Sequence, residues 1–186
     1  MTEPKAKANL REQFRNALLR AGGEYHAVRD LREAETVVAN ILAEAGASRI
    51  VVEDSPITRG LLPTSSAHTS TLAHLLPDKL QFAEADAGIT SVLTGIAATG
   101  TLVLAASRLT PRSTSLLPPL HIAVLRAEDL VATLAESFAR LATHDLPSQI
   151  IHITGPSRTG DIEHDLTRGV HGPHRVVVIC LIGETE

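Results

Sequence analysis

The chain has 186 residues, the size of one ordinary domain, which is enough to bury a hydrophobic core without disulfide bonds. Its 17 Lys and Arg against 21 Asp and Glu leave a formal net charge of −4, which excludes the basic footprint of a nucleic-acid-binding protein. Aromatic side chains make up 2% of the residues, too few to stack on the bases of a single strand.

The apolar segments are too short to cross a membrane. The longest uncharged apolar runs, residues 102–106 and 176–182, have the length of strands, whereas a bilayer span takes about 20 residues. The first residues of the chain lack the apolar stretch of a secretory signal, so we expect a cytoplasmic protein. The single cysteine, Cys180, cannot form an intramolecular disulfide, an iron–sulfur cluster or a cysteine-based zinc site. Redox chemistry would therefore need a partner protein or a borrowed cofactor.

The first part of the chain predicts two helices and a strand. Apolar residues recur at helical spacing over residues 5–21, where Gly22 and Gly23 end the pattern. The same spacing continues over residues 28–46, which predicts a second helix. The β-branched run at residues 49–53 predicts a buried strand, because a turn signal closes it.

The chain predicts one main domain behind an N-terminal helix. We expect residues 1–25 to form that helix, loosely attached, and residues 26–186 to form a single α/β domain. Within this domain, residues 64–71 are rich in Ser, Thr and Ala without a period, which predicts a loop. A helical patch follows at residues 72–76.

The middle of the chain predicts a strand pair and a long loop. Residues 89–96 and 101–106 are apolar or β-branched runs joined by a turn-like junction at residues 97–100, which indicates a hairpin or a bulged pair. Residues 107–119 contain two Arg, several Ser and Thr and three Pro, a composition that no regular element tolerates. Long loops of this kind often carry function.

After residue 119 strands and helices alternate. The pattern predicts strands at residues 120–125, 149–154 and 175–182, with helices at residues 127–143 and near residues 160–168. Such alternation favours an α/β fold with a largely parallel sheet that is covered on both faces.

The segment that holds Gly155, Ser157, Arg158, Thr159 and Asp161 is the first candidate for ligand binding. It follows a predicted strand and opens a predicted helix, so that backbone N–H groups and hydroxyls converge where α/β folds bind anions. Alternatively, Ser157 or Thr159 only caps the helix while the acid complements its dipole. No glycine spacing here matches a Walker loop or a dinucleotide fingerprint.

The turn at residues 169–173 is the second candidate, through His171. Together with His174 it offers two imidazoles, but the sequence has no His-Glu-x-x-His motif beside them, so we expect no built-in metal. A tight turn explains its glycines without any function. If the last strand runs parallel to the strand before it, this turn and the segment after Gly155 lie at opposite ends of the sheet. Only an antiparallel last strand, or a short helix that doubles back, brings them together.

Two further groups of polar residues are weaker candidates. Thr99, Gly100 and Thr101 place hydroxyls and a glycine at one end of the predicted strand pair, where they can contact a ligand. Arg108 and Arg112, in the long loop, offer planar donor forks for a carboxylate or phosphate. Solvated loop charge is the alternative for the two arginines.

Five motifs in a fixed order resemble the LUD-domain family, and within it the members that serve lactate utilisation. They are Gly88-Ile89-Thr90, Thr99-Gly100-Thr101-Leu102-Val103, Leu116-Leu117-Pro118 with His121-Ile122, Ile153-Thr154-Gly155-Pro156-Ser157-Arg158-Thr159 with Asp161-Ile162-Glu163, and Gly169-Val170-His171-Gly172-Pro173. The resemblance is dense over residues 86–182, whereas residues 1–85 agree only in the order of elements. It implies the three-layer α/β fold of the NagB/RpiA/CoA-transferase-like group.

The resemblance also implies a function. Members of the family resemble accessory subunits that work with iron–sulfur proteins in the oxidation of L-lactate to pyruvate. By this resemblance the chain is the cluster-free subunit, with iron–sulfur clusters on its partners only. We expect it to bind a small anionic ligand with the loop after the strand predicted at residues 149–154. The alternative is a stand-alone enzyme of CoA-transferase-like fold acting on a CoA, folate-like or sugar-phosphate substrate. The ligand, the choice between catalysis and scaffolding, and the oligomeric state stay open.

Two departures limit what the resemblance transfers. Many relatives carry an acidic residue directly before the Thr-Gly-Thr motif, and here that position is Ala98. The glutamate nucleophile of CoA transferases also finds no counterpart in the sequence pattern. Fold analogy alone therefore assigns no activity.

Overall fold

The computed structural model describes residues 3–61, 82–106, 111–143, 147–160, 166–168 and 172–183, and of residues 3–6, 158–160 and 166–168 only the backbone. In chain order its elements are α1 (Glu3–Arg20), β1 (Glu24–Val28), α2 (Leu31–Glu44), β2 (Ile50–Val52), α3 (Pro56–Arg59), β3 (Ala87–Ser91), β4 (Thr94–Ile96), β5 (Thr101–Ala106), α5 (Ser113–Leu116), β6 (Leu120–Arg126), the 3-10 turn η1 (Ala127–Asp129), β7 (Leu130–Val131), α6 (Leu134–Leu141), β8 (Gln149–Ile153), β9 (Arg158–Gly160), β10 (Leu166–Arg168) and β11 (Arg175–Leu181). The loop and helical patch predicted at residues 64–76 lie outside the described residues.

A parallel sheet forms the centre of the molecule. Strands β1, β11, β6, β3 and β2 lie side by side in this order, and every neighbouring pair runs parallel. Strand β6 is buried from Leu120 to Leu125, with Ile122 packed on one side and Ala123 on the other. Strands covered on both faces are near-continuous apolar runs, which is the pattern of this segment. The predicted α/β fold with a mostly parallel sheet is therefore confirmed.

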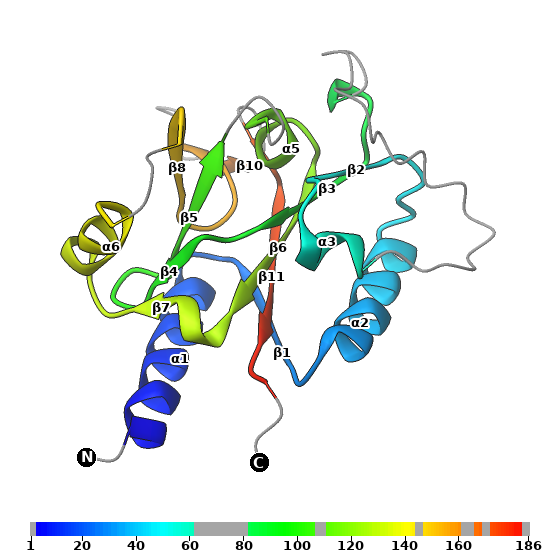
Figure 1. The fold of residues 1–186 in the computed structure, drawn as a ribbon. Coiled ribbons are helices and arrows are strands. Elements are labelled where there is room, and N and C mark those ends of the chain that lie inside the picture. Colours follow the sequence, from blue (N-terminus) through cyan, green and yellow to red (C-terminus); the bar gives the residue numbers. More distant parts are fainter. Residues whose placement is uncertain are drawn as a thin grey trace.

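Different layers cover the two faces of this sheet (Figure 1). Helices α2 and α3 lie on one face, where α2 contributes Val38 and Ile41 to the larger core cluster. The other face packs against α1 and a second sheet, with strand order β7-β4-β5-β8. Helix α6 lies on the outer side of this second sheet, where Leu141 packs against Ile96 and Val103.

The sequence pattern does not predict strand β1. The helical spacing noted from Val28 starts inside this strand, and α2 begins only at Leu31, after Asp30 has capped it by accepting a hydrogen bond of 2.8 Å from the Glu33 amide. The mixed composition of β1 does not predict a strand. Its place comes from tertiary pairing with β11, which Arg175 reinforces by a two-pronged ion pair to Glu24 at 2.6 and 2.8 Å.

Two predicted helices of the second half are also corrected. The segment predicted as a helix at residues 127–143 forms η1 and β7 before α6 starts at Leu134, because Thr133 caps this helix and Glu136 bonds back to the Ala132 amide at 2.9 Å. The helix predicted near residues 160–168 is wrong for the residues described there, since residues 158–160 (β9) and 166–168 (β10) form two antiparallel strands, and residues 161–165 lie outside the described part of the chain. In both places a few apolar residues at helical spacing predicted a helix, whereas the structure contains paired strands.

The middle of the chain divides between the two sheets. The run predicted at residues 89–96 is two strands, because β3 stays in the parallel sheet while β4 pairs antiparallel with β5 in the second sheet. The predicted hairpin is thus confirmed for β4 and β5. In the described part of the segment predicted as a long loop, residues 111–119, the one-turn helix α5 packs against β3.

Helix α1 packs tightly into the second core. Phe14 and Leu18 are fully buried there, although the sequence analysis expected a loosely attached helix; the division at residues 25 and 26 stays a prediction. A Cβ atom on Gly100 would lie 2.3 Å from the Leu18 amide nitrogen, and one on Gly155 would lie 2.5 Å from the Ala21 carbonyl oxygen. Both glycines have positive φ angles, so each provides an unusual backbone conformation and room for α1.

We predict that Gly100→Ala destabilises the protein much more than Gly46→Ala. The two glycines have similar φ angles, +68° and +62°, but a Cβ on Gly46 meets nothing within 4 Å. Gly46→Ala should therefore lower the free energy of unfolding by about 1–2 kcal/mol, the conformational cost alone. Gly100→Ala should lower it by about 3 kcal/mol or more, because α1 must move as well. Urea denaturation measures both, and equal losses would contradict a packing role for Gly100.

Candidate functional site

The predicted hydroxyl residues meet at one end of the second sheet. The Thr99 Oγ1 lies 2.6 Å from the Thr101 Oγ1, which in turn lies 2.7 Å from the Thr154 Oγ1 at the end of β8. Thr101 is buried, whereas Thr99 and Thr154 are exposed. The structure thus joins the turn before β5 to the segment that begins at Gly155. The three hydroxyls satisfy one another, which gives them a structural role whether or not a ligand binds there.

The two candidate segments of the second half also lie together. The Ser157 amide donates a hydrogen bond of 2.9 Å to the Pro173 carbonyl, and Gly172 packs closely against the Ser157 side chain. This contact is possible because β8 and β11 belong to different sheets, so the opposite-ends geometry considered from the sequence does not arise. The segments meet at the amino ends of β6 and β11, not at the carboxyl ends where α/β folds usually bind ligands.

Ligand contact by most residues of this predicted site stays a prediction, because their side chains are not described. Arg158 and Thr159 belong to β9, and their side chains are not among the described ones. Asp161 and His171 lie outside the described residues, as does Arg108. Arg112 is exposed at the start of α5. Ligand contact by Ser157 and its neighbours is therefore neither confirmed nor contradicted.

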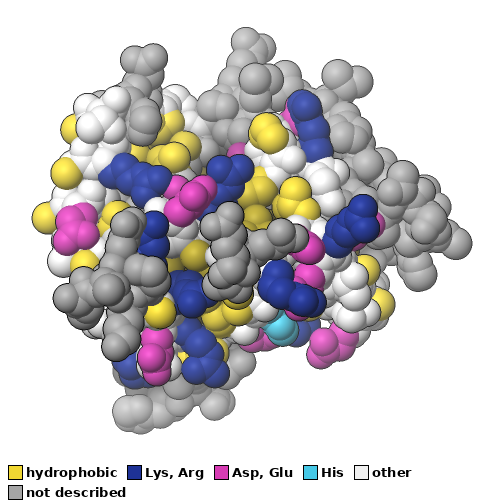
Figure 2. Space-filling model, turned by 60° about the horizontal axis from the view of Figure 1, so that its bottom comes forward, with side chains coloured by type: hydrophobic (Ala, Val, Ile, Leu, Met, Phe, Trp, Pro, Cys, Tyr) yellow, Lys and Arg dark blue, Asp and Glu magenta, His cyan; other side chains and the backbone are white. Residues whose placement is uncertain are grey.

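The carboxyl ends of the parallel strands form two cavities that the sequence analysis missed. The outer cavity, of about 610 Å³, lies where β1, β11 and β6 end, and Arg29, Arg32 and Arg126 are among its lining residues. The inner cavity, of about 260 Å³, lies where β2, β3 and β6 end, beneath Arg140 and Leu141 of α6. Figure 2 views the molecule from the side where β1 and β11 end and shows basic side chains gathered around exposed apolar surface.

Arg126 lines both cavities and is the less neutralised cation of the inner one. Its guanidinium lies 3.6 Å from the Glu128 carboxylate, and its side chain is 53% exposed. Arg140 is held more tightly, since it bonds to the Asp129 carboxylate and, at 3.3 Å, to the Glu128 carbonyl. Burial raises the pKa of Asp129, although the Arg140 charge opposes this. The lining of the inner cavity contains two arginines and one aspartate, and the Glu128 carboxylate lies beside Arg126 just outside this lining.

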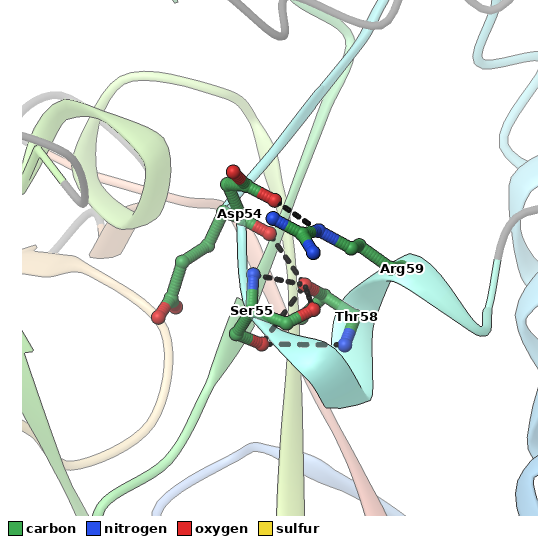
Figure 3. A network of polar contacts seen from close by, with 5 residues as sticks. Asp54, Ser55, Thr58 and Arg59 are labelled. Carbon is green, nitrogen blue, oxygen red and sulfur yellow. Dashed lines mark hydrogen bonds and ion pairs between the residues drawn. The ribbon is translucent and has the colours of Figure 1, made fainter.

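Helix α3 forms one wall of the inner cavity and is locked by its first turn (Figure 3). The Ser55 Oγ accepts a hydrogen bond of 3.3 Å from the Thr58 amide, and the Thr58 hydroxyl faces back to the Ser55 amide at 3.2 Å, a reciprocal capping box. The Thr58 hydroxyl also donates to the Glu53 carbonyl, while Asp54 pairs with Arg59 on the outside. These bonds fix the chain directly after β2, where Glu53 lies.

Glu53 is a partly buried carboxylate at this edge. Its Oε2 accepts a hydrogen bond of 2.8 Å from the Ser91 amide, and its Oε1 accepts one of 2.8 Å from the Ser91 hydroxyl. Burial raises the pKa of Glu53, although the two hydrogen bonds from Ser91 oppose the shift. Ser91 itself lines the inner cavity. In the sequence, Glu53 is only the acid that ends a β-branched run, so no motif singled it out.

Unpartnered polar atoms also lie at and behind this edge. Among the described side chains, the buried Thr94 Oγ1, Ser137 Oγ and His121 Nδ1 have no hydrogen-bond partner. Thr94 lines the inner cavity and is fully buried. The other nitrogen of His121 lies 2.8 Å from the Thr90 hydroxyl, and burial lowers the pKa of His121 to about 4. Buried polar groups normally have partners, so the unpartnered Thr94 hydroxyl is an unusual feature of the wall of this cavity.

We predict that His121 destabilises the protein as the medium becomes acidic. Above about pH 6.5 the imidazole is neutral in both states, but between about pH 6.5 and 4 only the unfolded chain binds the proton. The free energy of unfolding should therefore fall by up to about 3 kcal/mol more in the wild type than in His121→Gln, which keeps an amide near Thr90 and does not titrate. Urea denaturation across this range tests it, and parallel pH profiles would contradict it.

Within the part of the chain that the structure describes, no three His, Cys, Asp or Glu side chains are grouped to bind a metal ion. The expectation of no built-in metal or cofactor stays a prediction. None of the described helices has the length and hydropathy that a membrane span requires. The expected cytoplasmic compartment likewise stays a prediction.

Comparisons with known proteins agree with the resemblance seen in the sequence. Residues 11–181 match the family model described as LUD domain. A crystal structure of a DUF162 family protein from Deinococcus radiodurans superposes with a TM-score of 0.73 at 25% identity, covering 95% of this chain and 98% of that one. Proteins named "Lactate utilization protein C" are 32% identical in Halalkalibacterium halodurans, over 79% of this chain and 68% of the relative, and 39% identical in Bacillus licheniformis, over 56% and 46%. In the first relatives matched, the chain spans about half of their length.

Proposed function

The chain belongs to the LUD domain family, and on that premise we propose that it serves lactate utilisation by binding a small monocarboxylate in the inner cavity. Several relatives are named for lactate utilisation, which supports the pathway. Two arginines against one aspartate in the lining of the inner cavity support an anionic ligand class, because their guanidinium groups attract a carboxylate.

The proposal rests mainly on the guanidinium group of Arg126 and its position. A guanidinium offers a planar pair of donors that matches a carboxylate, and Glu128, the ion-pair partner of Arg126 among the described residues, lies 3.6 Å away, beyond hydrogen-bond distance. It lies at the carboxyl end of β6, the edge where parallel sheets usually bind ligands. The volume of about 260 Å³ suits a metabolite of a few carbon atoms rather than a large cofactor.

The oxidation itself falls, in this proposal, to iron–sulfur partner proteins. The chain has one cysteine, Cys180, which is buried in β11, and burial raises the pKa of its thiol. A single buried thiol cannot hold a cluster of the chain's own. The protein would thus present or retain the carboxylate while clusters on its partners accept the electrons.

We predict that Arg126→Ala weakens the binding of L-lactate by the purified chain about tenfold to hundredfold, the loss expected for hydrogen bonds to a charged group. Arg49→Ala is the matched control, because Arg49 precedes β2 at the other end of the sheet and is exposed. Its binding should equal that of the wild type in titration calorimetry. Unchanged binding in Arg126→Ala together with a loss in Arg158→Ala would move the anion to the segment after Gly155.

Growth tests the pathway independently of the cavity. Deleting the gene in its native host should abolish growth on L-lactate and leave growth on pyruvate intact, because only the oxidation step is lost. The wild-type gene and Arg49→Ala should restore growth, whereas Arg126→Ala should not. Normal growth on L-lactate in a deletion strain that has no duplicate gene would refute the proposed role.

A further inference from the structure

We infer that Glu53 makes Ser91 a hydrogen-bond acceptor toward the inner cavity, so that the cavity selects a 2-hydroxycarboxylate over the corresponding 2-oxocarboxylate. This inference rests on the proposed function and adds the substrate class and the residues that determine it. It assigns Ser91 to the ligand and gives Glu53 a positioning role through Ser91.

The direction of the Glu53–Ser91 hydrogen bonds follows from chemistry. An ionised carboxylate can only accept, and a backbone amide can only donate. Because Oε2 of Glu53 takes the Ser91 amide at 2.8 Å, Oε1 at 2.8 Å from the hydroxyl takes the single proton of that hydroxyl. The free positions on the Ser91 oxygen are then lone pairs, which accept a proton and cannot offer one.

The cavity lining distinguishes two ligands that differ only at the carbon next to the carboxylate. The Arg126 guanidinium provides donors for the carboxylate of either ligand. A 2-hydroxyl group can donate to the Ser91 oxygen, whereas a 2-oxo group brings a second acceptor against it. A site built to hydrogen-bond a hydroxyl discriminates against an analogue that lacks it, because its own polar group stays unpaired.

Thr94 completes the polar set of the inner cavity. It is fully buried, lines this cavity, and its hydroxyl has no partner among the described residues. A hydroxyl can both donate and accept, so Thr94 can bond to an oxygen of either ligand and does not discriminate. Selection between the two ligands therefore depends on Ser91, because its hydroxyl proton is already donated to Glu53.

Glu53→Gln reverses the direction of the hydrogen bond between residue 53 and the Ser91 hydroxyl without changing the shape of the side chain. The carbonyl oxygen of the new side-chain amide must accept from the Ser91 backbone amide, as Oε2 does now, so the NH₂ group faces the Ser91 hydroxyl and donates to it. The serine proton is then free to point into the inner cavity, where it can bond to a 2-oxo group. The preference for the hydroxy acid should disappear or reverse.

Titration calorimetry of the full chain with L-lactate and pyruvate tests the inference. The wild type should bind L-lactate about tenfold tighter or more, the effect of one unpaired buried group. Glu53→Gln should lose this preference through tighter pyruvate binding and weaker lactate binding. Glu84→Gln, which removes the same charge from an exposed side chain, should keep it. The titrations are run at pH ~8, far above the usual pKa of a glutamate, because burial raises the pKa of Glu53.

Ser91→Ala keeps the test decisive if Glu53→Gln does not fold, which circular dichroism reports. It removes the acceptor, so lactate binding should fall to the level of pyruvate binding while pyruvate binding does not weaken. Equal wild-type affinity for both ligands, or an unchanged preference in both variants, would overturn the inference and leave the proposed function intact. Failure of the wild type to bind either ligand would overturn the proposed carboxylate binding, and the inference with it.

Discussion

The parallel sheet is buried on both faces, and the arrangement of the other elements follows from covering them. Helices α2 and α3 cover one face, and α1 with the second sheet covers the other. Helix α1 packs closely because Gly100 presents no Cβ to its last turn and Gly155 presents none to Ala21, directly after the helix. Neither layer closes the carboxyl ends of the strands, so the open edge holds both cavities, and the polar residues that end β2, β3 and β6 lie there.

Polar groups at this edge are held by the chain that surrounds them. The capping box of α3 fixes the backbone after β2, and Glu53 accepts two hydrogen bonds from the end of β3. Burial of a carboxylate is unfavourable, and its two hydrogen bonds compensate only in part, because the pKa of Glu53 is still raised. This edge therefore combines a carboxylate whose burial is only partly compensated, at Glu53, with the unpartnered hydroxyl of Thr94, which lines the inner cavity.

Sequence patterns predicted the elements that bury continuous apolar runs. Strands β2, β6 and β11, helix α1 and the β4–β5 hairpin follow such runs, because burial on both faces or helical amphipathicity is visible in the local pattern. Strand β8, which is only partly buried, follows a short β-branched run. Strand β1 was missed and the helix near residues 160–168 was wrong. In both cases pairing with a distant or adjacent strand decided the structure, and a short window of residues does not record that pairing.

The order and spacing of the motifs by themselves determined the family and the α/β class, since these are properties of the linear chain. They also pointed to Ser157 and its neighbours, which the structure joins to the segment at Pro173 through one hydrogen bond. The inner cavity was decided by tertiary structure alone. Glu53, Ser91 and Arg126 lie far apart in the sequence, and they share no motif. They lie at one edge because parallel strands place their carboxyl ends together, however far apart those ends are in the sequence.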